Sequence, residues 1–269
     1  MRRRQTPRPQ ATAGAPTVEL RRMTAARPLL FSLLAAVALA GCAPAPKGGG
    51  INDPYEAQNR AVHRFNVGLD KDLLKPSSNV YGKVLPAPLR QGVSNVSSNL
   101  SEPSYVLNDL LQGNLAAGVQ NLFRFVLNTT AGVGGLFDTA TAIGLAPRPN
   151  DFGRTLHVWG ARQGAYLEVP FLGPSTERDL TGTIVDFAIN PLRFALNGNE
   201  RNAALLAEAG AKLGTRYRFS STIDSILYGS ADSYAQERLL YLQSRDHTLG
   251  IKSKTNQEFL DPYEDSYGN

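Results

Sequence analysis

After residue 42 the chain has no apolar run of about 18 residues, the length expected of a membrane-spanning helix. Its one cysteine, Cys42, leaves no possibility of an internal disulfide. The three histidines, His63, His157 and His247, lie far apart and lack the spacing of metal ligands. Each is interpreted as a surface or packing residue, and no metal site is predicted.

Motifs of common catalytic and nucleotide-binding sites are also missing. There is no Gly-x-Ser-x-Gly elbow of the common lipases. The glycines at 132–135 are not followed by Gly-Lys-Ser/Thr, so they do not form a phosphate-binding loop. The scattered aspartates are explained as acceptors for backbone N–H groups at helix starts and loops. The sequence therefore predicts no catalytic residues and no enzyme.

The net charge of +5 is misleading, because the excess of basic residues lies at the start of the chain. Residues 1–41 hold seven of the 28 basic residues and one of the 23 acidic ones. The remainder has 21 basic and 22 acidic residues and is close to neutral. Without a basic patch to neutralise phosphates, nucleic acid is excluded as a partner.

The first 41 residues have the pattern of an export signal. Arginines precede an apolar run at 29–40, which ends in Leu39-Ala40-Gly41-Cys42. This ending resembles the lipobox of bacterial lipoproteins, in which the cysteine thiol takes a diacylglycerol after cleavage. The alternative is an ordinary secretory signal with a chance cysteine. We predict cleavage before Cys42 and lipidation on it.

Two neighbouring residues refine this prediction. In bacteria that sort lipoproteins, aspartate after the lipidated cysteine favours the inner membrane, so Ala43 indicates the outer membrane. Residues 1–22 lack an apolar pattern, and Met23 would begin a compact signal, so Met23 is a candidate for the true start.

The rest of the chain has mostly helical patterns. We expect a helix from Asp53, with Asp53 as its cap and Pro76 as its end. A break at Glu102-Pro103 and a loop over 145–165 are also expected. The other expected elements are helices over about 90–100, 104–112, 115–128, 176–189, 198–213 and 233–245, and an extended segment over 166–171.

The expected helices on either side of Gly113 form a hairpin. In its second arm Leu115, Val119, Leu122 and Val126 share one stripe, with further apolar residues beside it. A helix that is apolar over more than one face is typical of a protein core or of a surface that faces a bilayer.

Many strings in the chain resemble those of the MlaA (VacJ) family of outer-membrane lipoproteins. The resemblance is dense over about residues 52–190 and returns weakly near 230–245. The strings are NDPYEAQNR (52–60), FN (65–66), GVSN (92–95), NLSEP (99–103), NDLLQG (108–113), RFVLNT (124–129), GVGGLFD (132–138), DFGRTL (151–156), WG (159–160), LGPSTERD (172–179) and SADSY (230–234).

The resemblance implies a mainly α-helical, ring-shaped single domain of amphipathic helices, with a central amphipathic channel and few or no strands. Such a ring would lie in the periplasm-facing leaflet of the outer membrane and move mislocalised phospholipids out of the outer leaflet. Porin trimers would hold it, and a periplasmic MlaC-like carrier would pass the lipids to an inner-membrane ABC transporter. No cofactor is implied.

The resemblance also suggests where the channel wall or a flexible gate lies. Phe65 and Asn66 are one candidate segment, and Gly132, Gly134 and Gly135 are the other. Helix core is an equally good interpretation of Phe65.

The expected organisation has four parts, each defined by its residues. They are a signal peptide (1–41), a lipidated linker (42–52), the helical ring domain (53–249) and a polar tail (250–269). Three functions stay open at this stage: a lipid-transfer channel, a scaffold lipoprotein that only binds porins or the envelope, and a lipid-acting enzyme.

Overall fold

A computed structural model describes residues 51–251. All of them belong to the second of two units into which the chain divides, residues 42–269. The predicted signal peptide, Met23, Cys42 and nearly all of the linker and tail lie outside the described residues.

The described residues are mainly helical, with one pair of short strands, which confirms the predicted fold class. The strands pair antiparallel, with Tyr166 opposite Thr176. The elements are α2 (Glu56–Leu69), the π-helix η1 (Asp70–Leu74), α3 (Lys75–Val84), α4 (Ala87–Leu111), α5 (Leu115–Thr130), α6 (Thr139–Ala142), α7 (Phe152–Val158), β1 (Tyr166–Val169), β2 (Gly173–Thr176), α8 (Glu177–Ile189), α9 (Leu192–Ala195), α10 (Gly198–Arg218), α11 (Ser220–Leu227) and α12 (Ser233–Leu249).

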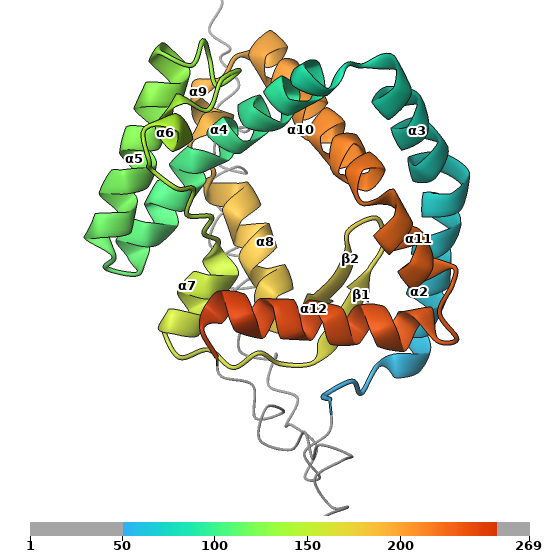
Figure 1. The fold of residues 1–269 in the computed structure, drawn as a ribbon. Helices are drawn as coiled ribbons and strands as arrows, with labels where there is room; N and C mark the ends of the chain where they lie inside the picture. The colour runs from blue at the N-terminus through green and yellow to red at the C-terminus, as the bar shows by residue number, and fades with distance from the viewer. Residues whose placement is uncertain (1–50, 252–269) are drawn as a thin grey trace, which may run out of the picture. The chain divides into compact units, whose positions relative to one another are not determined.

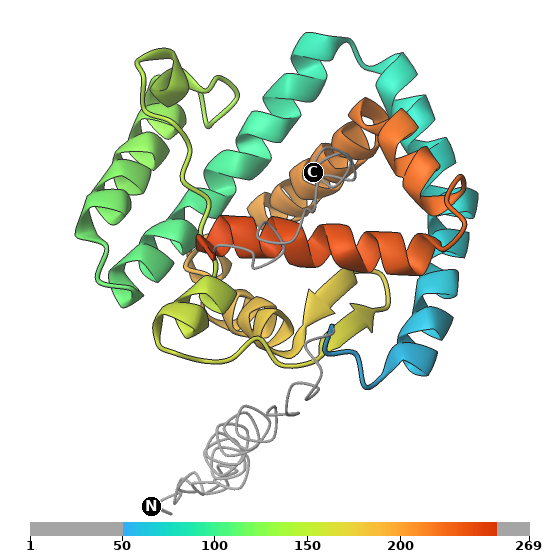
Figure 2. The ribbon, with the colours of Figure 1, turned by 60° about the horizontal axis from the view of Figure 1, so that its bottom comes forward.

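Contacts between these elements close into a ring. The helix α2 packs on β1, β2 packs on α8, and α8 packs on α7. In turn α7 contacts α4, α4 contacts α10, and α10 contacts α3, which continues α2 through η1. Figure 1 shows this circuit, with α5, the second arm of the hairpin, on its outer side. Helix α12 contacts β2 and α11, and Figure 2 shows it lying across the ring from the hairpin to α11.

The side chains buried between the elements of this ring are mostly polar. Among the described residues, the buried hydrophobic side chains are Ala117, Ala140, Ala165, Tyr166 and Tyr234, whereas 18 buried residues are polar or charged. Large apolar side chains lie on the surface of nearly every helix instead. A soluble domain has the opposite distribution, so this surface is suited to an apolar environment.

Helix α5 shows the inversion most clearly. Its predicted apolar stripe is confirmed, and it points away from the protein: Leu115 and Val119 are each 65% exposed. The opposite face, with Gly118, Asn121 and Arg124, is buried. Of the two interpretations of this hairpin, core or bilayer-facing, the structure supports the bilayer-facing one.

Buried charge takes the place of an apolar core between α4, α5 and α6. Arg124 Nε donates to Glu102 Oε1 at 2.8 Å, and both side chains are almost fully buried. The same guanidinium reaches Asp138 at 3.3 Å, Thr141 at 3.1 Å and the carbonyl oxygen of Leu145. Burial raises the pKa of Glu102, and Arg124 opposes that shift. One arginine thus pairs with two carboxylates and joins three helices.

Three sequence predictions about helix ends are wrong. Pro76 does not end a helix, because it occupies the first turn of α3, directly after the π-helical segment. Pro103 lies inside α4, which stays continuous because it packs on α5, α7 and α10. Asp53 does not cap α2; it accepts a hydrogen bond from Asn59 and contacts Tyr234 and Arg238.

Other predictions hold with small shifts. Gly113 ends the first arm of the hairpin with φ +71°, a conformation that favours glycine. Helix α8, expected over about 176–189, is capped by Thr176, and helix α12, expected over about 233–245, is capped by Asp232. The expected loop over 145–165 contains the short helix α7, which Asp151 caps.

We expect Arg124→Met to reduce the free energy of unfolding by about 3–5 kcal/mol, because it leaves Glu102 and Asp138 without their cation. Lys212→Met is the matched control, since Lys212 makes only an exposed pair with Glu208 and should cost less than about 0.5 kcal/mol. Unfolding in detergent micelles, followed by far-UV circular dichroism, measures both. Equal effects of the two variants would contradict the proposed role of the buried pair.

Two glycines have opposite surroundings and give a second prediction. A Cβ on Gly182 would lie 2.3 Å from the backbone nitrogen of Gly153, where α8 crosses α7, whereas a Cβ on Gly68 meets nothing within 4 Å. We expect Gly182→Ala to destabilise the protein by about 1–3 kcal/mol and Gly68→Ala to stabilise it by about 0.5–1 kcal/mol. The same unfolding measurement tests both signs, and a neutral Gly182→Ala would show that the helices do not need this close approach.

Candidate functional site

A cavity of about 510 Å³ lies between α2, η1, the β-hairpin and helices α10–α12. This volume is within the roughly 300–1,000 Å³ range of ligand pockets. Its wall is mixed. The apolar lining comes from Val67, Leu69, Leu74, Phe171, Leu172, Pro174, Ile223, Ile226, Leu227 and Leu240, and the polar lining from Asn66, Asp70, Glu168, Arg216, Glu237, Tyr241 and Ser244. The cavity can therefore take a ligand that has both a polar and an apolar part.

Part of the charge in this wall is already paired. Arg216 donates to both carboxylate oxygens of Asp70, each at 2.8 Å, and also to Asp224 at 2.7 Å. The Tyr228 hydroxyl donates to Asp70 at 2.6 Å. Hydrogen bonds to Asp70 and Asp224 raise the pKa of Arg216, so its charge is fixed. This cluster ties η1 to α10 and α11.

Asn66 fixes the β-hairpin against α2. Its amide donates to Glu168 Oε1 at 2.9 Å and to the Val169 carbonyl at 3.1 Å, and its oxygen accepts from the Phe171 N–H at 3.0 Å. Phe65 stacks edge-to-face on Phe171, with ring centroids 5.2 Å apart. The two predicted residues therefore act on one neighbour, the tip of the hairpin, and Asn66 also lines the cavity.

The predicted glycines occupy a different place. Gly132, Gly134 and Gly135 form the turn after α5 and do not line the described cavity. Gly135 has φ +88°, and a Cβ there would lie 2.6 Å from the Cβ of Asn99 on α4. These glycines allow the turn to pack tightly against α4, and their role as a gate stays a prediction.

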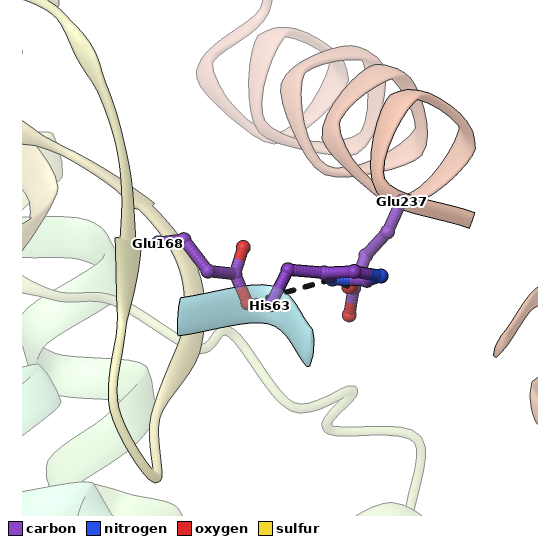
Figure 3. Close-up of side chains that lie close together, drawn as sticks. All are labelled: His63, Glu168 and Glu237. Carbon is purple, nitrogen blue, oxygen red and sulfur yellow. Dashed lines mark ion pairs between the residues drawn. The ribbon is translucent and has the colours of Figure 1, made fainter. Parts of the chain in front are cut away.

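A charged cluster in the cavity wall was not indicated by the sequence. His63 of α2 is nearly fully buried, and its Nδ1 lies 3.0 Å from Glu237 Oε2 and 3.9 Å from Glu168 Oε1 (Figure 3). Burial lowers the pKa of His63, but the two carboxylates outweigh it and raise that pKa to about 9. The other two histidines, each interpreted from the sequence as a surface or packing residue, are less buried: His157 is half-buried and His247 is exposed.

A second cavity, of about 410 Å³, lies between α4, α8, α9 and α10. Its wall includes Phe187 and Leu205, and its charges include Arg193 and Arg201. The Arg193 guanidinium stacks over the Phe187 ring, 3.6 Å from its centroid. Helix α10 borders both cavities, the first through Arg216 and the second through Arg201, Ala204, Leu205 and Glu208.

The geometry defines a helical ring whose buried side chains are mostly polar or charged, whose surface carries many large apolar side chains, and which is hollowed by amphipathic cavities. No helix within residues 51–251 is long and apolar enough to cross a membrane. An exposed apolar surface of this extent is characteristic of a protein that contacts lipid or another protein.

Comparison with known proteins gives the family. A model of the MlaA lipoprotein family matches residues 51–248. The chain is 32% identical over 226 residues to the Escherichia coli K12 intermembrane phospholipid transport system lipoprotein MlaA, covering 77% of this chain and 83% of that protein. An uncharacterised Rickettsia bellii protein is 34% identical over 200 residues, which is 74% of this chain and 77% of that one.

A solved structure agrees with these sequence matches. The structure, described as the structural basis for maintenance of bacterial outer membrane lipid asymmetry, superimposes with a TM-score of 0.63 at 33% identity. The match covers 73% of this chain and 98% of that one. The chain belongs to the MlaA lipoprotein family, as the resemblance of its strings predicts.

We expect Asn66→Ala to loosen the hairpin, because the substitution removes three hydrogen bonds that hold residues 168–171. If the free energy of local opening falls by about 1–3 kcal/mol, amide hydrogens in β1 and β2 should exchange roughly 5- to 150-fold faster. Arg64→Ala, at an exposed position two residues earlier on α2, is the control. Hydrogen–deuterium exchange read by mass spectrometry makes the comparison, and unchanged hairpin exchange in Asn66→Ala would exclude this anchoring role.

Proposed function

We propose that this protein removes mislocalised phospholipids from the outer leaflet of the outer membrane and passes them to the periplasmic side, maintaining lipid asymmetry. The observation that carries the proposal is the inverted distribution of polarity: the buried side chains are mostly polar, many large apolar side chains are exposed, and amphipathic cavities lie between the helices. The names of the characterised relatives, which are phospholipid transport lipoproteins, support it.

The physical reason is the cost of moving a headgroup through hydrocarbon. An unpaired charge loses its hydration there at a cost of several kcal/mol or more, so a lipid does not cross unaided at a useful rate. The described cavity presents carboxylate, guanidinium and hydroxyl groups beside apolar side chains. A headgroup can exchange water for these groups while its acyl chains follow the apolar wall.

We propose that two attachments hold the protein at the outer membrane. Lipid on Cys42 would tether the chain, and the apolar exterior of the ring would lie in the periplasm-facing leaflet. A single acyl chain gives only marginal binding, so a second contribution from the ring would strengthen the attachment. We propose the outer membrane because Ala43 follows the lipidated cysteine.

The partners proposed for this chain are those of the MlaA family resemblance. Porin trimers would hold the ring in the outer membrane. A soluble MlaC-like carrier would accept lipids, and an inner-membrane ABC transporter would receive them from the carrier. A passive channel sets no direction, so the direction of net flow would come from these partners.

Two segments are proposed to control passage. Phe65 and Asn66 would do so through the hairpin tip, because they hold Phe171 at the cavity wall. The glycine turn at 132–135 would act at a distance, by setting how α5 and α6 pack on α4. No catalytic residue is proposed.

Complementation of a deletion strain tests the function with a matched pair on α11. Ile226 lines the cavity, and Ser225 beside it is exposed. In Ile226→Glu, an unpaired carboxylate in the apolar wall should block acyl chains, so phospholipid should accumulate in the outer leaflet and sensitivity to detergent with chelator should persist. Ser225→Glu adds the same charge outside the lining and should restore the wild-type phenotype. Membrane abundance of both variants is measured alongside.

Three outcomes would contradict the proposal. Normal outer-leaflet composition in the deletion strain would exclude lipid removal. Full rescue by Ile226→Glu would favour a scaffold that only binds porins or the envelope. A change in lipid species, instead of lipid location, would favour a lipid-acting enzyme.

A further inference from the structure

We propose that His63, Glu168 and Glu237 form a binding site for a divalent transition-metal ion of the Zn²⁺ type. The three residues come from α2, β1 and α12, and their side chains converge at one point (Figure 3). This site goes beyond lipid transport and does not depend on it. The sequence did not indicate it because the residues lie far apart along the chain.

The distances suit a small cation. One ligand atom from each residue lies within 4.8 Å of the other two. His63 Nδ1 is 3.0 Å from Glu237 Oε2 and 3.9 Å from Glu168 Oε1. Ligands bound to Zn²⁺ at about 2.0–2.2 Å in a tetrahedron are about 3.4 Å apart, a value between these two distances. A small rotation of the Glu237 side chain would complete the geometry.

The buried histidine provides a second, independent indication. His63 is 3% exposed, and its Nδ1 makes no hydrogen bond of good geometry although it faces the two carboxylates. Its other ring nitrogen, Nε2, lies 2.9 Å from Ser233 Oγ. Metal-bound histidines are oriented in this way, with one nitrogen held by a hydrogen bond and the other directed at the ion.

Glu168 is also held in place, and both glutamates face the cavity. Glu168 accepts from the Tyr166 hydroxyl at 2.7 Å and from the Asn66 amide at 2.9 Å, so outer-shell partners fix its orientation. Both Glu168 and Glu237 line the 510 Å³ cavity, which supplies an entry path and room for a water as fourth ligand. Two carboxylates and one imidazole are a suitable ligand set for Zn²⁺. A bound ion would link three elements of the ring.

The test uses the full chain purified in detergent without a polyhistidine tag and treated with EDTA. Equilibrium dialysis against Zn²⁺, with metal analysis, should give one ion per chain. Co²⁺ should give the strong visible absorption of a tetrahedral site, and added Zn²⁺ should raise the melting temperature.

Variants assign the site to its residues. His63→Gln should weaken Zn²⁺ binding by more than the roughly 10–100-fold that loss of an outer-shell partner costs, and Ser233→Ala should fall within that range. His157→Gln and His247→Gln are matched controls and should bind as wild type does. Glu237→Gln changes the more exposed ligand and should also weaken Zn²⁺ binding. It tests the site independently if the His63→Gln variant fails to fold.

Two results would overturn the proposal. One is the absence of stoichiometric Zn²⁺ from the wild-type chain, which would leave His63 as the protonated partner of two carboxylates. The other is Zn²⁺ bound equally by wild type, His63→Gln and Glu237→Gln, which would place the ion elsewhere.

Discussion

Paired charge between helices is the interaction on which this ring depends. Few apolar side chains are buried within residues 51–251, and the elements there are joined by ion pairs and amide networks such as Glu102–Arg124 and Asp70–Arg216. In each, a guanidinium from one helix reaches a carboxylate from another across a buried contact. Removing one partner leaves an uncompensated charge, which makes each link specific for its neighbour. Because polar residues make the buried contacts, large apolar residues can lie on the surface.

The same inversion explains how a ring can be hollow. An apolar core closes to exclude water, whereas hydrogen-bonded side chains hold helices at fixed distances and tolerate cavities between them. The hairpin illustrates this. Asn59 and Asn66 fix its backbone to α2 through side-chain amides, and the cavity opens beside Phe171. The cavity wall is thus held in position by hydrogen bonds, and side chains do not fill the cavity.

Local signals in the sequence predicted much of this structure. The apolar stripe on α5 and the turn at Gly113 are each encoded within a few residues and were predicted from them. The wrong predictions concern helix ends whose structure depends on contacts with residues far away in the sequence. Pro103 stays helical because three other helices pack on α4, and Asp53 leaves its expected cap position to join Tyr234 and Arg238 from α12. Propensity and capping rules do not include such contacts.

The residues of the candidate site, like the helix ends, could be predicted only in part from the sequence. The resemblance selected Phe65 and Asn66, and the structure gives Asn66 contacts that a pattern along one helix could not reveal. His63 and Glu168 are 105 positions apart, so the ring topology was needed to bring them together. The orientation of the apolar stripe was open for the same reason, because periodicity identifies a face but not what the face contacts.

The central claim is that the apolar exterior of the ring lies in lipid. Trp159 is the only tryptophan, so Trp159→Phe with Val119→Trp places a single fluorophore on the exposed stripe of α5. In vesicles, lipids brominated on their acyl chains should quench this tryptophan strongly, and aqueous iodide should quench it weakly. Strong quenching by iodide, with none by the brominated lipids, would contradict the account.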